Sequence, residues 1–186
     1  MNRVWTMNGW IATVGLLTAI GGCRDAPGRQ AGVFPYNGSA APPINLRVFY
    51  APDSSSPPSV RLADHRGESV VLSFWSLSCR PCLREQPALS AFATRHRSDG
   101  LRVFGILIEG SVAEARTWLD EHGGASFPML DDVDGAVQRQ YLVHGIPDMY
   151  LIGPDGRVAS HCHGCVVFDS LFSVRLDSLR RIRTEL

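Results

Sequence analysis

Two cysteines that directly follow a buried strand constrain the fold more than any other feature of this chain. Residues 69–75, Ser-Val-Val-Leu-Ser-Phe-Trp, form an almost continuous apolar run with β-branched and aromatic side chains. Such a run is typical of a central strand that is covered on both faces. A Cys-Arg-Pro-Cys motif at residues 79–82 comes next, and from Leu83 the apolar residues recur at helical spacing. The sequence therefore predicts a CxxC motif where a buried strand meets the N-terminus of a helix.

This location favours the ionised form of the first cysteine. The first turn of a helix leaves backbone N–H groups unpaired, and the helix dipole adds partial positive charge there. Arg80 is a further positive neighbour of Cys79, and Pro81 suits the first turn because its missing N–H is not needed. Because the thiolate is the form that attacks disulfides, Cys79 and Cys82 are predicted to be a catalytic pair in thiol–disulfide exchange.

Further strands and helices alternate after this motif. We expect strands near residues 101–108, 148–152 and 157–161, and helices near residues 83–93, 111–122, 135–141 and 166–183. A Gly-Pro-Asp-Gly turn at residues 153–156 joins the last two strands as a β-hairpin. This order predicts an α/β fold with a central mixed β-sheet and helices on both faces.

The N-terminal residues have the pattern of a bacterial lipoprotein leader. Residues 1–22 contain one early positive charge and an apolar run that is too short to span a bilayer comfortably. They end in Ile-Gly-Gly before Cys23, which resembles the lipobox whose cysteine is lipid-modified. This interpretation predicts a lipid anchor on Cys23 and a domain in the bacterial cell envelope that faces the periplasm or exterior. An ordinary signal peptide or an anchor helix with a chance cysteine is the alternative.

Three segments follow from this interpretation: a signal peptide at 1–22, a flexible tether at 23–58 and a folded domain at 59–186. The tether is rich in Pro, Gly, Ser and Ala, which bury too little apolar surface to order a chain. Within the tether, residues 45–50 alternate apolar and polar side chains, so a short strand is possible there.

The five cysteines support an exported redox protein. They are Cys23, Cys79, Cys82, Cys162 and Cys165. If Cys23 carries lipid, the other four form two CxxC pairs with none left over. Exported thiols meet an oxidising compartment, so such pairs are expected to be disulfides or redox switches.

Residues 59–186 resemble the TlpA/ResA-like membrane-tethered disulfide reductases of the thioredoxin superfamily. Residues 73–87 are close to the pattern Phe-Trp…Cys-x-Pro-Cys…Glu-x-Pro, and residues 141–147 look like the segment that carries the cis-proline. The resemblance implies a thioredoxin-like fold and a cis bond between Ile146 and Pro147, with Pro147 facing the CxxC motif. A plain proline at the start of a strand is the alternative for Pro147.

The resemblance also implies an enzyme that needs no cofactor. Its partners would be disulfides of exported proteins, such as apocytochrome c or a copper-site protein during cytochrome c or copper-site maturation, and a membrane electron donor. The direction of electron flow cannot be read from the chain. Eighteen acidic and eighteen basic residues give zero formal net charge, and no basic cluster indicates nucleic-acid binding.

Two positions depart from the family pattern. The family usually has an aromatic residue directly before the first cysteine of the motif, whereas this chain has Ser78. ResA-like members also carry Gly-Glu after the second strand, where the acid tunes proton transfer, and here Glu109-Gly110 reverses that order. Glu109 is a candidate acid or base, and a solvated loop carboxylate is the alternative.

The second pair lies in the sequence His-Cys-His-Gly-Cys at residues 161–165. Cys162 and Cys165 could form a second redox pair or a structural disulfide near the first pair. Together with His161 or His163 they could instead bind copper or zinc. Inert thiols or a surface clip are a third interpretation. The signature of covalent haem attachment needs a histidine after the second cysteine, and Val166 stands there, which argues against it.

Two other functions compete with thiol–disulfide exchange. A copper-handling chaperone would hold metal at His161, Cys162, His163 and Cys165. A peroxide-reducing redoxin would need a lone peroxidatic cysteine in a Thr/Pro-rich loop, and the CxxC spacing argues against it.

Overall fold

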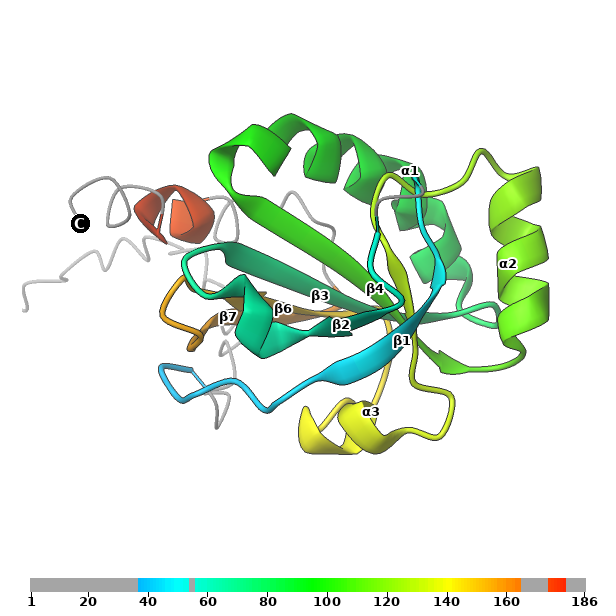
Figure 1. The fold of residues 1–186 in the computed structure, drawn as a ribbon. Coiled ribbons are helices and arrows are strands. Elements are labelled where there is room, and N and C mark those ends of the chain that lie inside the picture. Colours follow the sequence, from blue (N-terminus) through cyan, green and yellow to red (C-terminus); the bar gives the residue numbers. More distant parts are fainter. Residues whose placement is uncertain (1–36, 54–55, 165–173, 180–186) are drawn as a thin grey trace, which may run out of the picture. The chain divides into compact units, whose positions relative to one another are not determined.

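The computed structural model describes residues 37–53, 56–164 and 174–179. Within them, a mixed seven-stranded sheet has the order β2-β1-β5-β4-β3-β6-β7 (Figure 1). The strands are β1 (Asn45–Tyr50), β2 (Ser59–Arg61), β3 (Ser69–Ser76), β4 (Leu101–Glu109), β5 (Met129–Asp131), β6 (Asp148–Ile152) and β7 (Val158–His163). The helices are α1 (Arg80–His96), α2 (Val112–Glu121) and α3 (Ala136–Gln140), with 3₁₀ turns at Leu62–His65 and Arg97–Asp99.

Strand β3 is the buried strand that the sequence predicts. All eight of its residues are buried. It pairs in parallel with β4 and antiparallel with β6, so neighbours cover both of its edges. A strand that is covered on both faces carries apolar side chains in both directions, which explains the uninterrupted apolar run.

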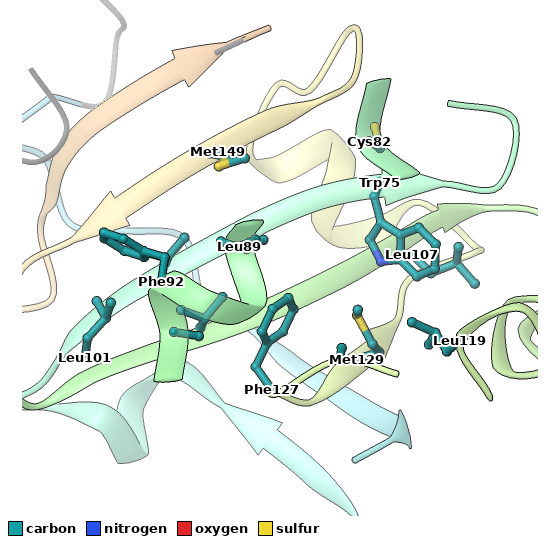
Figure 2. Close-up of a cluster of buried hydrophobic side chains, with 14 of the residues drawn as sticks. Trp75, Cys82, Leu89, Phe92, Leu101, Leu107, Leu119, Phe127, Met129 and Met149 are labelled. Carbon is teal, nitrogen blue, oxygen red and sulfur yellow. The ribbon is translucent and has the colours of Figure 1, made fainter. Parts of the chain in front are cut away.

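Helices cover both faces of the sheet, as predicted. On one face, buried side chains of α1 and α2 pack with Val71, Trp75 and other sheet residues in one apolar cluster. On the other face, Val137 and Tyr141 at α3 belong to a second cluster. Figure 1 shows α1 and α3 on opposite sides of the strands. Figure 2 shows the first cluster, with Cys82 at its edge next to Trp75.

The predicted short strand at residues 45–50 is confirmed as β1. It lies inside the sheet, between β2 and β5, and Val48 pairs with Leu130 of β5. The sheet therefore includes residues upstream of 59, where the sequence places the start of the folded domain. Of the last predicted helix, residues 174–179 are described and helical, and Leu176 is buried in the cluster beneath α1.

The lipoprotein leader and Cys23 lie outside the described residues. Among residues 37–53, 56–164 and 174–179, no helix has the length and the apolar composition that crossing a membrane requires.

A substitution in α2 tests the packing of the first cluster. Leu119 is fully buried, so Leu119→Ala should lower the free energy of unfolding by about 2–5 kcal/mol through lost burial and a residual cavity. Val133→Ala is the matched control, because Val133 is 44% exposed and its truncation should cost no more than about 0.5 kcal/mol. Urea denaturation of both variants measures the difference. Equal effects would contradict the burial of this face of α2.

Candidate active site

Cys79 and Cys82 form a disulfide at the N-terminus of α1. Their Cα atoms are 5.2 Å apart. Cys79 is the N-cap residue of the helix, and its Sγ accepts the backbone N–H of Cys82 at 3.1 Å. An unpaired amide at a helix start is the kind of donor that stabilises a sulfur anion. The predicted location of the pair is therefore confirmed, and the same amide can serve the thiolate after reduction.

The two cysteine residues are both buried and differ slightly in exposure. The Cys79 residue is 8% exposed and the Cys82 residue 3%, so Cys79 is the more accessible of the two. Both belong to the apolar cluster beneath α1. This difference favours Cys79 as the attacking sulfur and Cys82 as the resolving one.

The turn before the disulfide is held by its own polar groups. The N–H of Cys79 donates to the carbonyl of Ser76 at 3.3 Å. The hydroxyl of exposed Ser78, which replaces the family's aromatic residue, lies 2.8 Å from the hydroxyl of buried Ser76. These bonds fix the path of the chain between β3 and α1.

Glu85 is a site residue to which the sequence assigned no role. It lies three residues after Cys82, one helical turn further along α1. Burial raises the pKa of its carboxyl above the usual value, and the neighbouring Arg84 guanidinium partly opposes this shift. The spacing of Cys82 and Glu85 in the sequence could have indicated this position, because residues i and i+3 share a helix face. A carboxyl of raised pKa one turn from the pair is a candidate proton donor or acceptor.

Two buried polar atoms flank the disulfide without hydrogen-bond partners in the described structure. They are Nε1 of Trp75, in the strand before the motif, and Oε1 of Gln86, in the helix after it. Leaving a buried polar group unpaired costs free energy. Such groups are uncommon in native structures, and exceptions tend to occur at functional sites.

Pro147 lies at the same edge of the sheet as the disulfide. Its peptide bond with Ile146 is cis, as predicted. Phe74 near the end of β3 pairs with Asp148 at the start of β6, so the register places Pro147 beside Trp75. Ile146 packs against the cluster that contains both cysteines. The sheet thus brings together two segments that are about 65 residues apart in sequence.

The predicted acid Glu109 is at the end of β4. Its backbone pairs with Ser76 of β3, so it lies at the edge of the sheet from which the CxxC turn emerges. Its side chain is exposed. A role as acid or base stays a prediction.

Strand geometry separates Cys162 from His161 and His163. Tyr150, Met149 and Asp148 of β6 pair with His161, Cys162 and His163 of β7, respectively. Side chains alternate between faces along a strand. Cys162 therefore shares the face of Met149, which packs in the cluster with Cys79 and Cys82 (Figure 2). Both histidines point to the opposite face.

This alternation argues against the metal site predicted as an alternative. His161 and His163 lie on one face of β7 and Cys162 on the other. The described part of the chain contains no group of three or more His, Cys, Asp or Glu residues arranged to hold a metal ion. Cys162 is instead disulfide-bonded, and Cys165 and Cys23 lie outside the described residues.

His161 has a different partner on its face of the sheet. Its Nε2 lies 2.5 Å from Oδ1 of Asp148, and both side chains are nearly inaccessible, at 9% and 3% exposure. Its ring also packs against Tyr150. A buried carboxylate needs such a partner, so His161 supports the residue that directly follows Pro147.

Comparison with known proteins agrees with this arrangement. A family model described as the AhpC/TSA family matches residues 38–161, which contain the CxxC motif, Glu109 and Pro147. The chain belongs to this family. The match covers the sheet from before β1 to within β7, so this AhpC/TSA-family fold includes β1.

Curated relatives of this AhpC/TSA-family chain are named thiol-disulfide oxidoreductase ResA. The protein of Oceanobacillus iheyensis is 28% identical over 134 residues, which cover 72% of this chain and 68% of the relative. The protein of Geobacillus kaustophilus is 31% identical over 101 residues, covering 53% of this chain and 56% of the relative. The alignment with that second relative therefore spans little more than half of its length.

Solved structures of similar fold include further redox proteins. A Chlorobium tepidum protein provisionally described as the thiol:disulfide interchange protein DsbE has a TM-score of 0.68 at 23% identity, over 77% of this chain and 97% of its own. The exposed lipoprotein thioredoxin Etrx1 of Streptococcus pneumoniae has a TM-score of 0.62 at 22% identity, over 73% and 99%. These likenesses confirm the thioredoxin-like α/β fold. With the ResA relatives, the prediction of a thiol–disulfide oxidoreductase is confirmed at the level of enzyme class.

The raised pKa of Glu85 predicts a pH dependence of stability. Because the folded state holds this proton more tightly than the unfolded state, Glu85 favours folding at acidic pH, and that contribution is lost as the pH rises through the folded-state pKa. Glu85→Gln should therefore gain stability relative to wild type between about pH 4 and pH 7. The gain should be small because the side chain is only partly buried.

Urea denaturation of the oxidised proteins at several pH values measures this difference. Glu121→Gln, which removes an exposed carboxylate from α2, corrects for the loss of one surface charge. A constant difference between wild type and Glu85→Gln across this pH range would contradict the assignment.

Proposed function

We propose that this protein is a cell-envelope thiol–disulfide reductase that acts on exported proteins. The observation that carries the proposal is the Cys79–Cys82 disulfide, in which the slightly more exposed residue, Cys79, caps α1 and its Sγ accepts an amide N–H. The position of Pro147 at the same edge of the sheet supports it, as does the resemblance to proteins named ResA.

The proposed reaction begins from the dithiol form. The Cys79 thiolate attacks one sulfur of a substrate disulfide, forms a mixed disulfide and releases the first substrate thiolate. The Cys82 thiol loses its proton and attacks Sγ of Cys79, which releases the second substrate thiolate. The substrate gains two electrons from the enzyme, one proton from Cys82 and one proton from solvent, and the enzyme returns to the disulfide seen here. A membrane-associated dithiol donor would then reduce Cys79–Cys82 again.

The proposed location in the cell envelope rests on the N-terminal lipoprotein leader. Residues 1–22 would direct export, and lipid on Cys23 would anchor the mature chain to a membrane. The even number of remaining cysteines, 79, 82, 162 and 165, supports this assignment. Apocytochrome c and copper-site proteins are the substrates that the ResA resemblance favours.

Cys162 and Cys165 would form a second redox pair that exchanges electrons with the first. Cys162 is disulfide-bonded and faces the side of the sheet that carries α1. Its neighbour across the strands, Met149, packs in the same cluster as Cys79 and Cys82. Both disulfides would then be accessible to the same donor.

Substitution of either catalytic cysteine tests the main proposal. Cys79→Ser should reduce turnover in a disulfide-reduction assay to the background rate, because Cys79 is the sulfur that attacks the substrate and the second pair exchanges electrons only through the first. Cys82→Ser should accumulate a mixed disulfide with the substrate, because Cys79 attacks but is not resolved. Non-reducing electrophoresis and mass spectrometry detect the adduct. Full turnover by Cys79→Ser with loss in Cys162→Ser would show that the catalytic pair is wrong.

The second pair predicts a four-electron redox titration. In glutathione buffers of graded potential, wild type should take up about four electrons, two for each disulfide. The double variant Cys162→Ser/Cys165→Ser should take up two. Alkylation of free thiols followed by mass spectrometry counts the reduced cysteines at each potential. If Cys162 and Cys165 stay oxidised at every potential tested, the second pair is a structural disulfide and not a redox pair.

A further inference from the structure

A surface groove lies beside the catalytic turn. It has a volume of about 460 Å³ and is bounded by the end of β3 and by one face of α2. Its lining residues are Leu77, Ala113, Glu114, Thr117, Trp118 and Glu121. The spacing of the five helical residues places them along one stripe of α2. The groove is therefore built from residues that the exchange chemistry does not use.

The groove is adjacent to the attacking sulfur. Leu77 precedes Cys79 by two residues, and two residues span at most about 7 Å. Leu77 also packs against the cluster that contains both cysteines. A polypeptide whose disulfide is attacked by Cys79 can therefore place neighbouring residues in this groove.

Trp118 provides a rigid apolar wall. Its ring stacks on His122, with centroids 4.4 Å apart and planes 15° apart. Its ring centroid also lies 6.3 Å from that of the buried Trp75 ring. An indole held by two aromatic neighbours loses little conformational entropy when it binds a ligand. Together with Leu77, it suits an apolar side chain.

Two exposed carboxylates line the groove. Glu114 and Glu121 are exposed, and neither forms an ion pair within the part of the chain that the structure describes. Glu109, at the end of β4, adds a third exposed carboxylate before α2 begins. The guanidinium of Arg116, on the same helix, donates to the carbonyl of Phe49 on β1. The groove thus combines apolar walls with two exposed carboxylates that form no ion pair among the described residues.

We propose that this groove binds the substrate chain next to its reactive cysteine and selects an apolar side chain flanked by lysine or arginine. The inference rests on the proposed function and specifies its substrate. Apolar contact with Trp118 and Leu77 would anchor the segment, and Glu114 and Glu121 would attract its cations. Charge complementarity of this kind acts mainly on the association rate and on specificity, and it weakens with salt.

Two synthetic peptide disulfides test the proposal. They share a sequence with leucine next to the cysteine and differ only in carrying two lysines or two glutamates beside it. The reduced full chain reacts with each peptide at low ionic strength, and stopped-flow tryptophan fluorescence gives the second-order rate constants. We expect a lysine-to-glutamate ratio of about tenfold, from two partly screened charge pairs. The ratio should fall towards one in high salt.

Variants of α2 then test whether the preference for the lysine peptide comes from the groove. Glu114→Gln/Glu121→Gln should lower the lysine-to-glutamate ratio about three- to tenfold, since each exposed charge pair contributes a small factor. Asp120→Asn is the matched control, because it removes one carboxylate from the same helix outside the groove lining, and the wild-type ratio should persist. Replacing the peptide's leucine by serine should slow the lysine peptide in wild type.

Several outcomes would overturn the inference. The first is a wild-type ratio near one, and the second is an unchanged ratio in Glu114→Gln/Glu121→Gln. A third is sedimentation that shows a dimer which these two substitutions dissociate, because the groove would then hold a second copy of this chain. Turnover of hydroxyethyl disulfide, which lacks a peptide, separates these results from failure of the proposed function. If wild type reduces it and Cys79→Ser does not, the proposed exchange chemistry is supported independently of the lysine-to-glutamate ratio.

Discussion

The junction between β3 and α1 is the constraint on which the rest of this structure depends. Strand β3 is buried along its whole length. After the end of β3 the chain turns directly into α1, and Cys79 becomes the N-cap residue whose sulfur accepts a helix amide. The disulfide is consequently held by the strand behind it and the helix ahead of it.

Pro147 is placed at the site by the pairing of distant strands and not by the local chain. Antiparallel pairing of β6 with β3 sets which residue lies beside the disulfide, and a shift of one residue would turn Pro147 and its neighbours to the other face. The buried hydrogen-bonding contact of Asp148 with His161 supports that register from the next strand. The active-site edge thus combines one segment placed by local structure with another placed by the sheet.

The sequence could predict the features that depend on local periodicity and turn chemistry. Strand β3, the helix at the CxxC motif, α2 and the hairpin of β6 and β7 all follow from such signals. The insertion of β1 between β2 and β5 could not be predicted, because strand order is set by contacts between distant residues. The raised pKa of Glu85 depends on burial, which the sequence does not reveal.

The motif at residues 161–165 shows why residue spacing alone is ambiguous. On paper, alternating histidines and cysteines resemble a metal site. In β7 the alternation of side chains sends Cys162 towards the face of α1 and directs His161 to a buried carboxylate on the other face. One short sequence therefore serves two chemistries at once. Its histidine contacts the first residue of the strand that begins directly after Pro147, and its cysteine adds a disulfide on the face where the catalytic sulfurs lie. The strand period, rather than the list of ligating residues, decides which chemistry is possible.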